Sequence, residues 1–258
     1  MTRSDRPTIL VTNDDGIASP GLQELARALA EVGEVAIVAP EHNWSSSGHS
    51  KTMHKPLRVT PTRLTDGTPA LAASGSPSDC VALALLGVLE CTPALVVSGI
   101  NQGANVGHDI TYSGTVSAAM EAVIAGIPAI AISLDSYDGG QFALAAQFAA
   151  KLAARLLQEH LERPLLLNVN VPVPEDGEIR GVEITRLGKR IYRDALVHRS
   201  DPRGRSYYWI GGDPPDGVPE EGTDIGALHR GQISVTPIIL DLTDYEGIEI
   251  LRRWSLTL

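Results

Sequence analysis

Residues 9–16 have the sequence ILVTNDDG, and this stretch decides how the chain is interpreted. A short apolar run rich in β-branched residues predicts a buried strand, and here the run stops abruptly at Asn-Asp-Asp-Gly. In an open α/β sheet, ligands bind just beyond the carboxyl ends of the strands. The sequence therefore predicts that Asp14 and Asp15 lie where a ligand would bind.

The Asp14–Asp15 pair has two interpretations at this point. Adjacent carboxylates repel each other, and keeping both charged destabilises the fold unless a cation bridges them. Hard divalent ions take oxygen ligands, so Mg²⁺, Mn²⁺ or Ca²⁺ would suit the pair. The alternative is an Asx-type turn before a helix, because Asn, Asp and Gly dominate turns. The rest of the chain has to decide between them.

Composition limits the classes of protein that need to be considered. The 258 residues suit one large domain or one domain with an appendage, and 43% hydrophobic with 20% charged residues is typical of a globular protein. A net charge of −10 disfavours stable nucleic-acid binding. No apolar run is long enough for a membrane helix, and the polar residues 1–7 do not resemble a secretory signal. Cys80 and Cys91 have no metal or redox spacing, so we expect a cytoplasmic, reduced protein with Cys80 in its core.

The first two-thirds of the chain alternates predicted strands and helices. Apolar strands in such an alternation indicate an α/β fold, with a mostly parallel sheet covered by helices on both faces. Strands are expected at residues 9–14, 35–38, 56–60, 70–73, 94–98, 128–134 and 165–171, and helices at 20–32, 77–89, 115–125 and 141–162.

The composition and the pattern of predicted elements change after Pro172. Gly, Pro and acidic residues become frequent, and short strands at 207–210 and 232–237 replace the alternation. We therefore predict two parts, a metal- and phosphate-binding core at 1–171 and a β-rich C-terminal extension at 172–258. Exposed arms of this kind often pair with a neighbouring subunit.

Polar loops at 13–16, 45–49 and 98–101 follow three of the predicted strands and should converge on one crevice. Two carboxylates, a hydroxyl and an amide carbonyl would form an open shell for a hard cation. The Ser113-Gly114-Thr115 step into a helix suits a phosphate, although a simple N-cap would have the same sequence. The glycines at 99–107 lack the spacing of a dinucleotide-binding fingerprint, and the chain has no Walker-type Gly-Lys-Ser/Thr.

Several long motifs resemble the SurE family of survival-protein nucleotidases. They are VTNDDGIASPGL (11–22), APEHNWSSSGHS (39–50), SGSPSDCVALAL (74–85), VSGINQGANVGHDITYSGTVSAAMEA (97–122) and IPAIAISL (127–134), with shorter matches at 168–172 and 233–237. The resemblance implies a Rossmann-like core followed by a β-hairpin and a C-terminal extension that subunits exchange, hence a homodimer or homotetramer. It also implies a phosphatase that uses one divalent metal per subunit and acts on nucleoside 5′- and often 3′-monophosphates, with some members trimming short polyphosphate.

The resemblance also assigns the site residues. The metal ligands of the family fall on Asp14, Asp15, Ser45 and Asn101. The phosphate-binding residues fall on Asn105, Ser113, Gly114 and Thr115, with Asn13 of the turn expected beside them, and Asp109 matches a family aspartate near the site.

These residues predict hydrolysis by a metal-activated water molecule, with Asp14, Asp15, Asp109 and His108 as the catalytic candidates. Asp15 is slightly favoured to orient the water. His108 could protonate the leaving nucleoside, and His49 less so, but a structural hydrogen-bonding role is the alternative for both. Two other functions stay open: an aspartyl-phosphate phosphatase with Asp14 as nucleophile, and a nucleotide-binding regulatory module without turnover.

Overall fold

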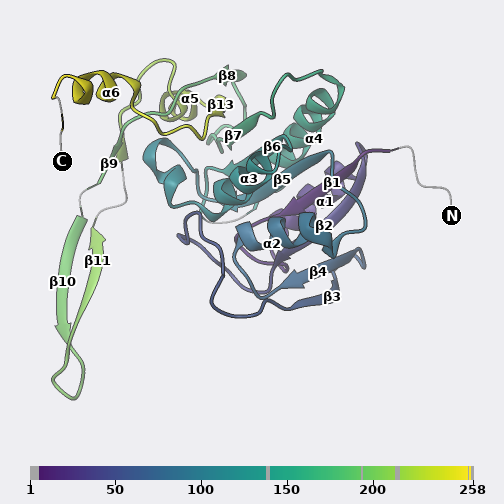
Figure 1. The fold of residues 1–258 in the computed structure, drawn as a ribbon, viewed down its shortest axis with the longest axis horizontal. Helices are drawn as coiled ribbons and strands as arrows, with labels where there is room; N and C mark the ends of the chain where they lie inside the picture. The colour runs from purple at the N-terminus through teal and green to yellow at the C-terminus, as the bar shows by residue number, and fades with distance from the viewer. Residues whose placement is uncertain (1–5, 138–139, 193, 213–215, 255, 257–258) are drawn as a thin grey trace.

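The structure is a computed structural model of the chain that describes residues 6–137, 140–192, 194–212, 216–254 and 256. Within these residues, a nine-stranded sheet forms the centre of the fold (Figure 1). In spatial order the strands are β3 (Val59–Arg63), β4 (Pro69–Ala73), β2 (Glu34–Pro40), β1 (Thr8–Thr12), β5 (Leu95–Gln102), β6 (Ala129–Leu134), β7 (Leu166–Val171), β13 (Ile233–Ile238) and β8 (Val182–Ile184). Strands β4, β2, β1, β5, β6 and β7 run parallel, whereas β3 and β13 are antiparallel to their neighbours β4 and β7. This arrangement confirms the predicted α/β class.

Helices cover both faces of the sheet, so the parallel strands are buried on both sides. α1 (Pro20–Leu29) and α4 (Phe142–Gln158) pack together on one face, and α2 (Pro77–Leu83) and α3 (Gly114–Ile124) pack together on the other. Side chains along a strand point alternately to the two faces. Ile9 of β1 accordingly joins the core cluster under α1 and α4, and Leu10 joins the cluster under α2 and α3.

The order of the strands places a ligand crevice at the end of β1. The chain passes from β1 to β2 and β4 on one side, then crosses back to build β5, β6 and β7 on the other. The connections that leave the neighbouring strands β1 and β5 therefore run to opposite sides of the sheet. This makes the gap beyond the carboxyl ends of β1 and β5 the topological switch point. The Asn-Asp-Asp-Gly turn follows β1 directly at this point.

Some elements differ from the sequence prediction. β3 begins at Val59 rather than residue 56, because its pairing with β4 is set by the turn at 64–68, where Leu64 N–H donates to Thr68 O at 2.9 Å. The helix expected to reach residue 89 ends at Leu83 and continues as a π-helical turn, Ala84–Val88, that contains Gly87 at φ 120°. Two short C-terminal helices, α5 (Asp224–His229) and α6 (Tyr245–Arg252), are absent from the prediction.

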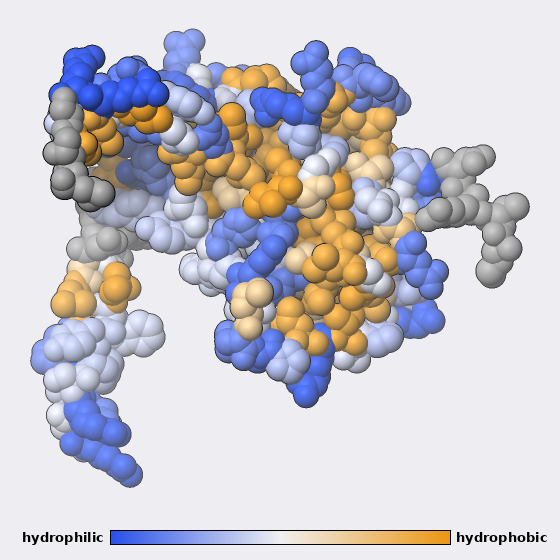
Figure 2. All heavy atoms as spheres, viewed as in Figure 1, coloured by the Kyte–Doolittle hydropathy of each residue, from blue (hydrophilic) through white to orange (hydrophobic). Residues whose placement is uncertain are grey.

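The C-terminal part contributes both to the sheet and to a projecting arm. β13 and β8 complete the central sheet, so part of the predicted extension belongs to it. β9 (Arg190–Ile191) pairs with β12 (Asp216–Gly217), and β10 (Asp194–Ser200) pairs with β11 (Ser206–Gly212) in a hairpin that points away from the body (Figure 1). Figure 2 shows hydrophobic residues near the base of this hairpin and hydrophilic residues at its tip. No helix among the described residues is long and apolar enough to span a membrane.

Candidate active site

The turn after β1 is closed by its own asparagine. The Asn13 side chain is buried, its amide nitrogen donates to Gly16 O at 3.0 Å, and its oxygen accepts from Gly16 N–H at 3.2 Å. Both ends of the amide are therefore engaged inside the turn, which places Asn13 as a residue that shapes the turn. The backbone of the turn also holds the next loop, because Trp44 N–H donates to Asp14 O at 2.7 Å.

Asp14 is buried against the N-terminus of α3. Its side-chain oxygens accept from Thr115 N–H at 3.1 Å and from the Thr115 hydroxyl. A Cβ at Gly114 would lie 2.7 Å from Asp14 Cβ, so only glycine allows this close approach. Burial raises the pKa of Asp14 even though the hydrogen bonds from Thr115 oppose the shift. Thr115 was predicted as a phosphate ligand, but its hydroxyl and backbone N–H both donate to Asp14.

Asp15 is held less completely. Its Oδ1 accepts from Asn43 Nδ2 at 3.3 Å, but its Oδ2 is buried without a hydrogen-bond partner among the described residues. Burial first and the charge of Asp14 second raise the pKa of Asp15 to about 6. A buried carboxylate oxygen without a donor is the kind of group that a cation would satisfy.

A pocket of about 350 Å³ opens beside Asp14. Ser45 lies at its edge on an exposed loop, and the Asn101 amide nitrogen donates to Gly103 O at 2.7 Å, which leaves the Asn101 carbonyl oxygen as its ligand group. The described residues contain no group of three or more His, Cys, Asp or Glu that could hold a metal. The chemistry of the set, two carboxylates with neutral oxygens, nevertheless fits a hard cation. The lining residues are Asp14, Ser45, Ser46, Asn101, Gln102, Gly103, Ala104, Asn105, Asp109, Tyr112, Ser113, Tyr137 and Tyr192.

Asn105 and Ser113 line the predicted phosphate side of the pocket. Ser113 caps α3, with its hydroxyl accepting from Val116 N–H at 3.1 Å. Asn105 is fixed by buried side chains from β7, because Asn170 pairs with both its N–H (2.8 Å) and its C=O (3.0 Å) while Asn168 donates to the same C=O. Asn168 and Asn170 were not predicted as site residues. Their signal was two asparagines at alternate positions of an otherwise apolar strand.

Asp109 lines the pocket but is bound to the C-terminal part. It lies on the 3₁₀ helix Gly107–Thr111, accepts from Arg190 Nε at 2.8 Å and also accepts from the Tyr192 hydroxyl. Burial raises the pKa of Asp109, and the Arg190 guanidinium opposes that shift. His108, on the same helix, is exposed and is not among the lining residues.

Two further carboxylates hold segments of the site, and neither was predicted as a site residue. Glu121 of α3 is buried and binds His49 Nε2 at 3.1 Å and Lys51 Nζ at 2.5 Å, which ties the loop of Ser45 to α3 and gives His49 a structural partner. Asp224 is fully buried and accepts from Gly107 N–H at 2.8 Å and Gly188 N–H at 2.7 Å.

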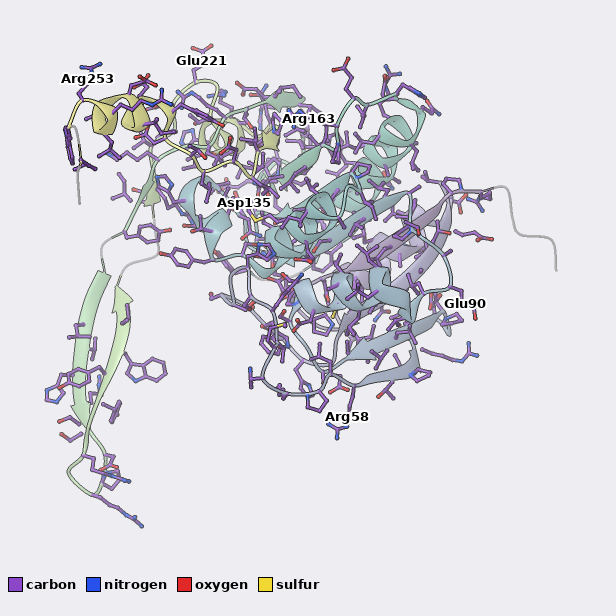
Figure 3. All side chains as sticks on the ribbon, in the orientation of Figure 1. Arg58, Glu90, Asp135, Arg163, Glu221 and Arg253 are labelled. Atoms are coloured by element: carbon purple, nitrogen blue, oxygen red, sulfur yellow. The ribbon has the colours of Figure 1, made fainter. Side chains whose placement is uncertain are left out.

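Asp135, labelled in Figure 3, follows β6 at the same edge of the sheet, and burial raises its pKa.

A family model for survival protein SurE matches residues 9–194. The chain belongs to the SurE family. The protein named 5′-nucleotidase SurE from Herpetosiphon aurantiacus is 53% identical over 245 residues, covering 94% of this chain and 96% of that protein. Its namesake from Chloroflexus aggregans is 52% identical over 249 residues, covering 96% and 98%. The crystal structure of the SurE protein from Aquifex aeolicus matches with a TM-score of 0.81 at 41% identity, covering 96% of this chain and 99% of that chain.

Membership of the SurE family confirms the resemblance that the motifs indicated. The matched span, 9–194, includes the turn after β1, the N-terminus of α3 and the Arg190–Asp109 pair, so the whole pocket lies within the SurE region. The similarity to the Aquifex aeolicus SurE structure extends over nearly the full chain.

Proposed function

We propose that this SurE-family chain is a 5′-nucleotidase that releases inorganic phosphate from nucleoside 5′-monophosphates and also from 3′-monophosphates. One observation carries the proposal: Asp14 lines a polar pocket at the switch point of the sheet, and the adjoining Asp15 has a buried Oδ2 without a hydrogen-bond partner among the described residues. Asp15 itself is not among the lining residues. The names of the Herpetosiphon and Chloroflexus relatives support the reaction.

Asp14, Asp15, Ser45 and Asn101 would hold one divalent cation per subunit, Mg²⁺ or Mn²⁺, because all four offer oxygen ligands. When bound, such a cation stabilises negative charge on a phosphoryl group and lowers the pKa of a water molecule. Thr115 keeps Asp14 in one orientation through two hydrogen bonds, so the Asp14 carboxylate is preorganised.

The other residues divide the remaining tasks. Asn105, Ser113 and Gly114 would contact the phosphate where charge develops in the transition state. Asp15 has an oxygen without a donor and would orient the attacking water or take its proton. Asp109 would hold the 3₁₀ helix through Arg190, and the exposed His108 on that helix is our proposed proton donor to the leaving nucleoside.

An aspartyl-phosphate mechanism would use Asp14 as nucleophile. Asp14 is only 3% exposed and its carboxylate accepts two hydrogen bonds from Thr115, which disfavours in-line attack on a substrate phosphorus. No observation favours a regulatory module over an enzyme. Inversion at a chiral, isotopically labelled phosphate would distinguish direct attack by water from a covalent intermediate.

The decisive experiment measures inorganic phosphate released from a panel of nucleoside monophosphates, with Mg²⁺ or Mn²⁺ and with a chelator. We expect cation-dependent release that Asp14→Asn abolishes. Asp66→Asn, at an exposed loop carboxylate, is the matched control and should keep wild-type turnover. Absence of cation-dependent release across the whole panel would overturn the proposal.

We also propose that residues 1–171 carry the metal- and phosphate-binding residues, and that within 172–258 the hairpin and the C-terminal helix form an oligomerisation arm exchanged within a homodimer or homotetramer. Tyr192 from this second part lines the same pocket. Support comes from exposed apolar side chains: Trp209 and Ile210 on the hairpin, Leu251 on α6, and Trp254 just after α6. Ile210→Asp should shift the mass measured by light scattering towards the monomer. A cytoplasmic location is part of the same proposal, and cell fractionation tests it.

A further inference from the structure

Three tyrosines converge on the pocket from segments that are far apart in the sequence. Tyr112 follows the 3₁₀ helix Gly107–Thr111, Tyr137 follows β6, and Tyr192 follows β9. All three line the pocket that contains Asp14, Ser45 and Asn101. The exposed fractions of the three side chains are 64%, 75% and 44%. Burying a tyrosine ring normally stabilises the folded protein, so three rings left exposed at one pocket indicate a role in binding.

The protein supports each tyrosine from behind while its ring stays accessible. A Cβ at Gly103 would lie 2.5 Å from the Tyr137 ring, so this ring rests on a glycine of the pocket wall. The Tyr192 hydroxyl donates to Asp109. The backbone of Tyr112 donates to Asp109 O at 3.0 Å and accepts from Gly48 N–H at 3.0 Å. Each of the three tyrosines is therefore held by at least one contact to a residue of the pocket wall or of a neighbouring loop.

The pocket lining thus combines two chemically different kinds of group. Carboxylate, amide and hydroxyl groups, among them Asp14, Ser45 and Asn101, line it together with the three exposed tyrosines. A nucleoside monophosphate has the same division, with a charged phosphate at one end and a flat aromatic base at the other. Bases stack on aromatic side chains without regard to sequence, because every base has a π-face.

We propose that Tyr112, Tyr137 and Tyr192 form the nucleoside subsite, in which the base of the substrate stacks on tyrosine rings. The proposal rests on the nucleotidase function proposed above and goes beyond it by naming what holds the base. Stacking without edge-on hydrogen bonds accepts all four bases and favours purines, whose stacking surface is larger. Tyr192 belongs to the C-terminal part, so the subsite is complete only when that part is folded against the 3₁₀ helix.

The test compares kcat/KM for adenosine 5′-monophosphate with kcat/KM for ribose 5-phosphate, which has the same phosphoester but no base. Each tyrosine is replaced by leucine, which keeps bulk but removes the ring, and by phenylalanine, which keeps the ring. Tyr137→Leu should lower the ratio of the two values by roughly 5- to 100-fold, mainly through KM for the nucleotide. Tyr137→Phe should keep most of the ratio. Tyr245→Leu, at an exposed tyrosine of α6 remote from the lining residues, should leave it unchanged.

Each outcome decides between defined alternatives. A ratio that stays at the wild-type value in all three leucine variants overturns the subsite, and so does an equal loss on both substrates, which would mark the rings as structural or as a subunit contact. Tyr192→Phe separates ring from hydroxyl, since it removes only the hydrogen bond to Asp109. If the wild-type protein releases phosphate from neither substrate, the proposed function itself fails. If it cleaves both with equal kcat/KM, the function holds and the subsite fails.

Discussion

Replacing Asp15 by asparagine should abolish activity and yet stabilise the metal-free protein. Asp14 is buried and the adjacent Asp15 is half-buried, and burial together with the charge of Asp14 raises the pKa of Asp15 to about 6. A raised carboxyl pKa means that the folded state disfavours the ionised form. The Asp15→Asn variant removes that unfavourable charge without changing the shape of the side chain.

The size of the effect follows from the two pKa values. Moving from the ordinary 3.8 to about 6 corresponds to about 3 kcal/mol at a pH well above both values. Asp15 is only partly buried, and solvent screening reduces this figure to roughly half, about 1.5 kcal/mol. Because the folded state binds the proton more tightly, stability falls as pH rises from 3.8 through about 6. The advantage of the variant should therefore be complete near pH 8 and vanish towards pH 4.

Thermal unfolding in chelator at pH 8 measures this difference. At about 2–4 °C per kcal/mol for a chain of this size, Asp15→Asn should unfold roughly 3–6 °C above the wild type. Saturating Mg²⁺ or Mn²⁺ should reverse the order, since a cation at about 100 times its Kd stabilises the wild type by about 2.7 kcal/mol. Asp66→Asn should respond to the cation as the wild type does. A wild type more stable than Asp15→Asn in chelator at pH 8 would refute the reasoning, and equal cation shifts in both would refute Asp15 as a ligand.

Three other substitutions test how the site is held. Thr115→Val leaves the buried Asp14 carboxylate without its hydroxyl donor and should lower kcat about 10- to 100-fold in a phosphate-release assay, with Thr115→Ser restoring most of it. Gly114→Ala places a Cβ 2.7 Å from Asp14 Cβ and should weaken cation binding about tenfold or more by titration calorimetry; unchanged affinity would contradict the close packing. Glu121→Gln frees the loop of Ser45, so the cation concentration for half-maximal rate should rise about tenfold while kcat at saturating cation stays within about twofold. A fall of about tenfold in kcat at saturating cation would instead assign Glu121 a different role.

The sequence predicted those parts of the molecule whose signal is local. Apolar runs identified the parallel strands because these strands are buried on both faces and need no alternation. The N-cap interpretation of Ser113 was available from the sequence because capping depends on residues within one helical turn, and Ser113 caps α3 in the structure. Asp14 and Asn101 were placed in one pocket because parallel strands end at the same edge of a sheet.

Long-range pairings could not be predicted in this way. The sequence around Thr115 is compatible with a phosphate-binding helix start, and only the fold shows its hydroxyl on a carboxylate 101 positions earlier. Asp224 has the pattern of a helix N-terminus, yet its carboxylate bridges Gly107 and Gly188. β13 has the apolar pattern of any buried strand, and nothing in that pattern specifies an antiparallel position beside β7.

The two adjacent aspartates are supported by opposite means, and this difference bears on their roles. Asp14 receives two hydrogen bonds from Thr115, so its orientation is fixed before any ligand binds. Asp15 keeps a buried oxygen without a donor, so the folded protein is less stable than it would be with a neutral side chain there. Local instability that a ligand would relieve is typical of functional sites. A fixed carboxylate suits a structural ligand whose geometry must not change during turnover. An under-satisfied carboxylate gains more from an added hydrogen-bond donor, which is our reason for proposing Asp15 rather than Asp14 as the group that orients the attacking water or accepts its proton.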